Sequence, residues 1–101
     1  MSAGKGSDVA SGRRSEAHAV AGPGGVMTDE VGVITGELLV STEVSGDRLQ
    51  VRVQYAGAEE WYTLTGSPFS LGERTARSAR AALLRAVRHG LPEGLPGGKL
   101  P

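Results

Sequence analysis

The sequence predicts a small α+β domain, in which an antiparallel meander of three strands, or four, is followed by one C-terminal amphipathic helix packed on one face. Three observations predict this class. Between residues 31 and 65, three segments have strand character: residues 31–44 alternate in a broken pattern, residues 49–55 alternate cleanly, and residues 61–65 are rich in aromatic and β-branched side chains. Residues 67–90 then follow a helical period. The links between the strand segments are short, and short links imply antiparallel pairing.

Both ends of the chain are predicted to be disordered tails. Residues 1–28 are rich in Gly, Ser and Ala, so burial there would not offset the entropy lost on ordering. Residues 91–101 are rich in Pro and Gly and form the second, flexible tail. The predicted folding unit is therefore residues 29–90, with β-β-β-α order. A unit of about 60 residues buries little surface, so we expect oligomerisation, most simply a homodimer.

The strands follow from β-branched residues, alternation and glycine. Residues 31–44 form the first strand region, and Gly36 inside it predicts a bend that splits the region into two short strands. Residues 49–55 alternate cleanly, as a half-buried antiparallel strand does. Residues 61–65 are dense in aromatic and β-branched side chains and form the third strand.

The helix has start and stop signals. Ser70 and Glu73 fit a capping box, in which Ser70 is the N-cap and Glu73 reaches back to its amide. Gly90 suits the position after the last helical residue, and Pro92 prevents continuation. The apolar face is narrow and mostly alanine, which permits close approach to a sheet. Its predicted members are Gly72, Ala76, Ala79, Leu83, Ala86 and Val87.

We expect the helix to cover the apolar face of the sheet. That face should hold Leu38, Val40, Val51, Val53 and Leu64. Because one helix covers a three-stranded sheet only partly, the remaining area predicts either a dimer partner or a docked tail.

Composition excludes several functions. The chain has no Cys, so disulfides, thiol catalysis and Cys-ligated zinc are excluded. Glu59 and Glu60 are adjacent and point apart, which favours a solvated turn over a catalytic or metal-binding pair. His18 falls in the predicted tail and His89 at the helix end, where a histidine has a common structural role. We therefore predict no catalytic, cofactor-binding or metal-binding residue, and no cofactor.

No apolar run has the length of a signal peptide or a membrane span, so we expect a cytoplasmic protein without a membrane partner. The formal net charge is zero, but the charges are unevenly distributed. Residues 30–66 hold six acidic and two basic residues, whereas residues 67–91 hold five arginines and one glutamate. This separation suits self-association, or nucleic-acid contact through the helix alone.

Four arginines form a predicted stripe on the solvent face of the helix. Arg74, Arg77, Arg85 and Arg88 fall within about 80° of arc, with Arg80 to one side. Guanidinium groups suit phosphates, because each is a planar fork of donors that stays charged. The stripe has three interpretations: a solvated helix face, a nucleic-acid or other polyanion contact, and a contact with an acidic protein surface.

Leu39 and Trp61 are predicted to share the sheet face that the helix does not cover. An exposed Trp there is an interface anchor, since Trp is enriched at binding hot spots. Alternatively, Trp61 packs against Leu39 or under the N-terminal tail.

These observations predict a non-enzymatic interaction module that self-associates or binds a protein partner. The alternative is a small nucleic-acid-binding or regulatory protein that uses the arginine stripe. Nucleic acid is a possible partner but is not favoured, because no recognised nucleic-acid motif accompanies the charges.

Overall fold

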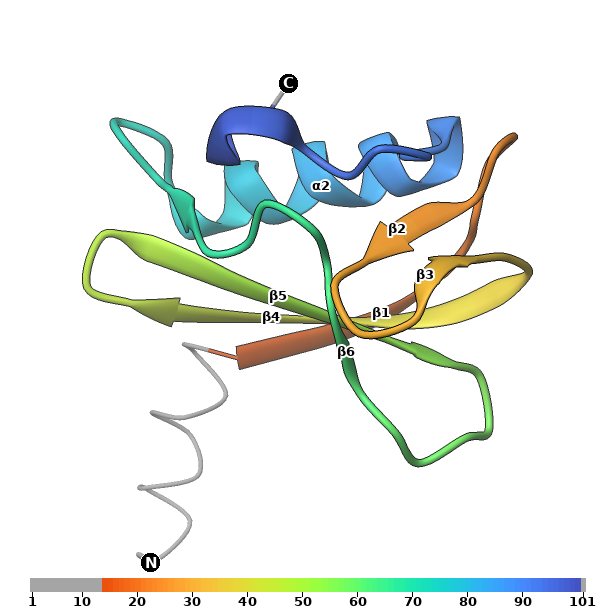
Figure 1. Ribbon diagram of the computed structural model, residues 1–101. Coiled ribbons are helices and arrows are strands. Elements are labelled where there is room, and N and C mark those ends of the chain that lie inside the picture. Colours follow the sequence, from red (N-terminus) through yellow and green to blue (C-terminus); the bar gives the residue numbers. More distant parts are fainter. Residues whose placement is uncertain (1–13, 101) are drawn as a thin grey trace, which may run out of the picture.

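The computed structural model describes residues 14–100 and confirms the predicted α+β class, with antiparallel sheets and one α-helix in that part of the chain (Figure 1). The elements, in chain order, are β1 (Arg14–Val20), β2 (Val26–Thr28), β3 (Gly32–Ile34), β4 (Glu37–Ser45), β5 (Arg48–Tyr55), β6 (Tyr62–Thr63), β7 (Phe69–Ser70), α2 (Ala76–His89) and the 3-10 turn η1 (Pro96–Gly98). No helix within residues 14–100 is long and apolar enough to cross a membrane.

Five strands form the main sheet, in the order β1-β4-β5-β6, and β7 also pairs with β5. The predicted meander is therefore present as β4, β5 and β6, all antiparallel. Gly36 separates β3 from β4, as predicted, and has a φ of +88° that other residues rarely adopt. β3 leaves the main sheet and pairs with β2 in a second, two-stranded sheet.

The predicted N-terminal tail is wrong for residues 14–28. β1 pairs antiparallel with β4 along its whole length, and Val26 of β2 is fully buried. The inward side chains of β1 are small, with Ala19 only 5% exposed. Alanine carries little apolar surface, so composition understates how well this strand packs when a neighbour supplies its hydrogen bonds. Residues 1–13 of the predicted tail lie outside the described residues.

The predicted C-terminal tail is also wrong over residues 91–100. The Leu91 amide donates to the Gly25 carbonyl at 2.7 Å, and the Leu91 carbonyl accepts from the Met27 amide at 2.8 Å. Leu91 and Leu95 are buried, and the Leu95 amide donates to the Thr65 carbonyl at 2.9 Å. Two leucines and a few backbone bonds are enough to dock this segment on β2 and on the chain that follows β6. Pro101 lies outside the described residues.

The predicted helix start is wrong, and the predicted end is confirmed. Ser70 belongs to β7, because Phe69 is fully buried opposite Leu49 and holds this segment on β5. The N-cap is instead Thr75, whose hydroxyl accepts from the Ser78 amide at 3.0 Å. Gly72 of the predicted apolar face is therefore outside the helix and exposed.

Gly90 ends the helix at a φ of +104°, and its amide donates to the Ala86 and Val87 carbonyls. The chain after β1 crosses this point closely. The Gly22 amide donates to the Val87 carbonyl at 2.9 Å, and a Cβ on Gly90 would lie 2.1 Å from the Pro23 carbonyl oxygen. Glycine is therefore needed here for contact as well as for helix termination.

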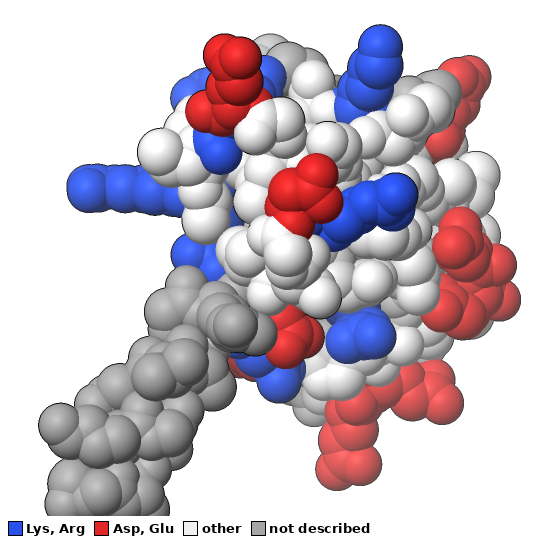
Figure 2. All heavy atoms as spheres, turned by 90° about the vertical axis from the view of Figure 1, so that its left-hand side faces the viewer, with Lys and Arg blue, Asp and Glu red and all other residues white. Residues whose placement is uncertain are grey.

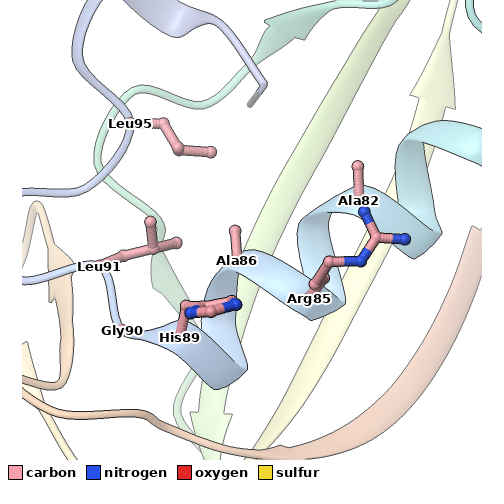
Figure 3. A pocket seen from close by; sticks show the side chains of 7 residues that line it. All are labelled: Ala82, Arg85, Ala86, His89, Gly90, Leu91 and Leu95. Atoms are coloured by element: carbon pink, nitrogen blue, oxygen red, sulfur yellow. The ribbon is translucent and has the colours of Figure 1, made fainter.

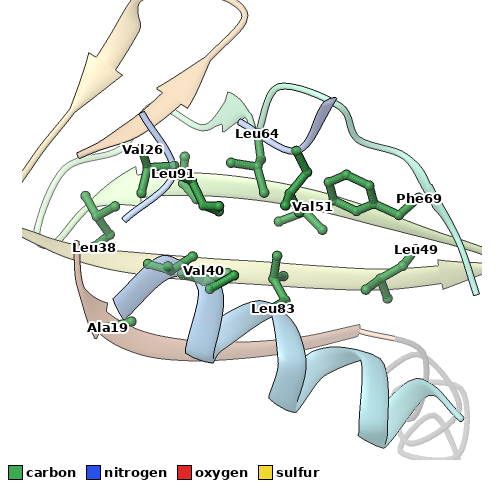
Figure 4. Close-up of a cluster of buried hydrophobic side chains, with 14 of the residues drawn as sticks. Ala19, Val26, Leu38, Val40, Leu49, Val51, Leu64, Phe69, Leu83 and Leu91 are labelled. Atoms are coloured by element: carbon green, nitrogen blue, oxygen red, sulfur yellow. The ribbon is translucent and has the colours of Figure 1, made fainter. Parts of the chain in front are cut away.

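The core lies between the inner face of the main sheet and the segments that cover it (Figure 4). The five predicted sheet residues, Leu38, Val40, Val51, Val53 and Leu64, are all at most 1% exposed. Helix α2 contributes Ala79, Leu83 and Val87, all fully buried. Val26 and Leu91 cover the part of the face that the helix leaves open. Of the two expected ways to cover it, docked segments of the same chain are the one observed.

Candidate interaction surfaces

Strand β1 forms an open edge of the main sheet. The Ala21 amide donates to the Gly36 carbonyl at 2.9 Å, one residue beyond the register pair of Val20 with Glu37. Hydrogen-bonded and non-hydrogen-bonded pairs alternate in an antiparallel ladder. Ser15, Ala17 and Ala19 therefore exchange backbone bonds with β4.

The remaining residues of β1, namely Arg14, Glu16, His18 and Val20, direct their N–H and C=O groups away from β4. No residue within 14–100 hydrogen-bonds to these backbone groups. The opposite edge of the sheet is different. At β6, the Thr63 carbonyl accepts from the Asp29 amide at 3.0 Å, and the Thr63 amide donates to a Glu30 carboxylate oxygen at 2.7 Å. The loop after β2 thus closes that edge, whereas no residue within 14–100 closes the edge at β1.

The side chains of the same four β1 residues lie on the outer face of the sheet, opposite α2. Arg14 donates to Glu16 at 2.9 Å, and His18 Nδ1 lies 3.3 Å from a Glu37 carboxylate oxygen. Val20 is 62% exposed. The prediction that His18 is unstructured is wrong, because it is held in this strand.

The outer face carries both residues predicted as an interface, Leu39 and Trp61, and each is half-buried. The register places Leu39 beside Gln54, and Trp61 comes one residue before the pair of Tyr62 with Val53. Arg14 Cζ lies 6.0 Å from the centre of the Trp61 ring. Since β4 and β5 separate β1 from β6, these two long side chains reach toward each other across the outer face.

Two polar side chains on the outer face, Ser41 and Gln54, are only 7% exposed. Trp61 is itself only partly exposed and lies near Arg14, so it presents only part of its surface. The interface role of Leu39 and Trp61 stays a prediction.

A polar network closes the β6 end of the same face. Glu30 accepts from the Thr63 amide at 2.7 Å and from the Thr63 hydroxyl at 2.8 Å. The bond from the Thr63 amide is the main reason that the pKa of Glu30 is lowered, and the nearby Arg52 adds to the effect. The Tyr62 hydroxyl donates to Glu60 at 2.8 Å, which raises the pKa of Tyr62. Glu30 is exposed and Tyr62 is partly buried against the core, and local hydrogen bonds explain the pKa shift of each residue.

The structure splits the predicted arginine stripe. Arg74 precedes the N-cap and is not part of the helix. Arg80 turns toward the sheet and donates to the Thr42 hydroxyl at 2.9 Å. Arg77, Arg85 and Arg88 are exposed on α2 and form no ion pair with a described residue. Figure 2 shows the end of the molecule that faces left in Figure 1, where basic and acidic side chains are interspersed.

Sequence reasoning missed the open edge, although a weak signal was present. Residues 14–20 alternate between charged or large side chains and the small residues Ser15, Ala17 and Ala19. These small residues carry little apolar surface, so the alternation of apolar and polar residues that indicates a strand is weak here. Among the described residues, no three His, Asp or Glu side chains gather closely enough to hold a metal ion.

No family model, curated protein or solved structure matches the chain. The function is therefore inferred from these surfaces alone.

Proposed function

We propose that the protein is a non-enzymatic interaction module that self-associates by pairing β1 with β1 of a second copy. The open edge of β1 is the observation that supports this proposal. An unpaired row of N–H and C=O groups is a template for another strand. The seven-residue length of β1 makes it a longer template than the two-residue β6 at the other edge.

Charge selects one antiparallel register for this pairing. The residues that direct backbone groups outward are Arg14, Glu16, His18 and Val20, so these must face one another across a twofold axis. When the twofold axis passes through Ala17, Glu16 of each copy lies opposite His18 of the other copy. The neighbouring registers oppose Glu16 with Glu16 or His18 with His18. Opposite charges across strands stabilise pairing by about 0.2–1 kcal/mol each, which applies to Glu16 and His18 when His18 is protonated, and like charges destabilise it.

On the inner face, Ala17 would face its own copy and Ser15 would face Ala19, so β1 itself presents only small side chains there. Arg80 and Leu84 of α2 lie beside Ser15 and Ala17, so the α2 helices of the two copies would also meet on this face. The half-exposed Leu39 and Trp61 lie on the outer face of the extended sheet, where a further partner has access to them.

Sedimentation equilibrium across about 10 μM to 1 mM protein tests the proposal, since short edge contacts give weak association. The expected result is a mass that rises with concentration toward twice that of one chain. Glu16→Lys and His18→Glu each weaken association in the selected register. His18→Glu opposes two carboxylates, and Glu16→Lys removes the carboxylate that faces His18 and opposes like charges where His18 is protonated. The double variant restores it, because the introduced lysine of each copy then faces the introduced glutamate of the other.

Glu59→Lys is the matched control, because it makes the same charge change in the exposed loop before β6. It should leave association unchanged, and thermal unfolding should confirm that every variant folds. A monomer at all concentrations would contradict the proposal, and the charges on β1 would then act to protect the edge. Single variants that associate like the parent chain would reject the register.

Nucleic-acid binding through α2 is the second candidate. It is supported by Arg77, Arg85 and Arg88, which are exposed and form no ion pair with a described residue. Fluorescence anisotropy with short DNA and RNA would show affinity that falls steeply as salt rises. The double variant Arg77→Glu with Arg88→Glu would abolish it. Nucleic-acid binding through α2 would be rejected if the double variant kept its affinity. It would also be rejected if the parent chain did not bind at low salt.

A further inference from the structure

A pocket lies beside the C-terminal half of α2, where the segment after the helix folds back (Figure 3). Its volume is about 320 Å³, near the lower end of the range for small-molecule sites. The side chains that line it are Ala82, Arg85, Ala86, His89, Leu91 and Leu95, and Gly90 completes the wall.

The floor of the pocket is apolar and firmly placed. Ala82, Ala86, Leu91 and Leu95 are each 6–8% exposed, so they are core residues that show one surface to the pocket. Leu91 and Leu95 are held by backbone bonds to Gly25 and Thr65. A floor of this kind favours a hydrocarbon or aromatic group, because burying apolar surface is favourable.

The rim is basic. Arg85 and His89 are four residues apart on α2, and Figure 3 shows both beside the same hollow. Residues at this spacing are neighbours on one helix face. Arg85 has no hydrogen bond or ion pair with any described residue, so its donors are available to a ligand. Among the described residues, no acidic side chain lines the pocket.

We infer that this pocket binds a small amphipathic monocarboxylate, with its apolar body on the leucine and alanine floor and its carboxylate on Arg85. A guanidinium presents two parallel N–H groups that match the two oxygens of a carboxylate. His89 supplies one more N–H donor at the rim. An amine of the same shape would oppose Arg85, and an alcohol would lack the charge.

This site is independent of the proposed self-association. The other flank of α2, with Arg80 and Leu84, faces Ser15 and Ala17 of β1. The pocket flank faces Leu91 and Leu95 instead. A ligand bound there would leave the β1 edge unchanged.

The test is a titration of ¹⁵N-labelled protein with octanoate, followed by amide chemical shifts, with octanol and octylamine as comparisons. Octanoate should shift the amides of Ala82, Ala86, Gly90 and Leu91 saturably. It should bind about tenfold more tightly than octanol, as a charged hydrogen bond implies. The same titration of Glu16→Lys should give the same result, which separates this site from self-association.

Arg85→Gln should weaken octanoate binding about tenfold and leave octanol binding unchanged. Arg77→Gln is the matched control, since it removes an exposed arginine of the same helix that does not line the pocket. It should have no effect. The inference is overturned if octanoate leaves these amides unshifted, if octanol binds as tightly as octanoate, or if Arg85→Gln binds octanoate like the parent chain.

Discussion

The two faces of the main sheet are built from the same strands with the same alternation, but they meet different surroundings. On the inner face, Leu38, Val40, Val51 and Val53 are at most 1% exposed beneath α2 and the docked terminal segments. On the outer face, the alternate residues are mostly charged or polar, with Leu39 and Val20 as apolar exceptions, and no described helix covers them. Alternation therefore divides the sheet into a face that forms the core and an outer face that no described helix covers.

Substituting one leucine on the inner side of the sheet and one on its outer face compares the stability that each face contributes. Leu83→Ala removes a fully buried side chain of α2 and should lower the free energy of unfolding by about 3 kcal/mol, through lost burial and a residual cavity. Leu39→Ala on the outer face should cost about 1 kcal/mol or less, because that side chain is half-exposed. Urea denaturation measures both. Equal losses would mean that the outer face is covered as firmly as the inner one.

A second test concerns the helix that covers the inner face, and asks which residue caps its N-terminus. Thr75→Ala should cost about 1 kcal/mol, since it removes the hydroxyl that accepts from the Ser78 amide. Ser70→Ala should change stability by less than about 0.5 kcal/mol, because Ser70 is exposed in β7 and caps no helix. Thermal unfolding of the two variants measures the difference. A larger loss for Ser70→Ala would move the helix start back to the capping box that the sequence predicts.

The polar network on the outer face should have the smallest effect, and it should depend on pH. Because folding lowers the pKa of Glu30 below its ordinary value of 4.5, the unfolded chain binds the proton more readily. The stabilisation is therefore present above that ordinary value and is lost as the pH falls through the lower, folded-state value. Glu30→Gln should be less stable than the parent chain at neutral pH by under about 1 kcal/mol, since the group is exposed.

The Glu30→Gln difference should shrink as the solution is made acidic. Chemical denaturation at neutral pH and at several acidic values measures this trend. Glu59→Gln is the control, because no residue within 14–100 hydrogen-bonds to that carboxylate. A difference for Glu30→Gln that is constant with pH would show that its hydrogen bonds to Thr63 do not depend on charge.

Local sequence signals predicted some elements correctly and one end of the helix incorrectly. Gly36 and Gly90 mark chain reversals that require a positive φ, so they show in the sequence without a partner. The Ser70–Glu73 capping box is also a local signal, but burial of Phe69 against β5 outweighs it and delays the helix to Ala76. A cap is worth about 1 kcal/mol, whereas a fully buried aromatic side chain is worth about 1.5–3 kcal/mol.

The candidate surfaces depended even more on tertiary structure. The sequence predicted Leu39 and Trp61 on one face, and the register supports that placement. It predicted four arginines in a stripe, of which three remain on α2. The β1 edge and the pocket on α2 both include residues from the segments that were predicted to be tails. Composition alone does not show which distant residues these segments pack against.

The sequence by itself determined the α+β class, the five buried sheet residues, the apolar side of the helix and its end at Gly90. These follow from periodicity and backbone stereochemistry, which act within a few residues. Only the tertiary structure decided that β1, β2 and residues 91–100 belong to the fold. Such segments carry little apolar surface of their own, and they become ordered because distant residues supply their hydrogen bonds and cover their few buried side chains.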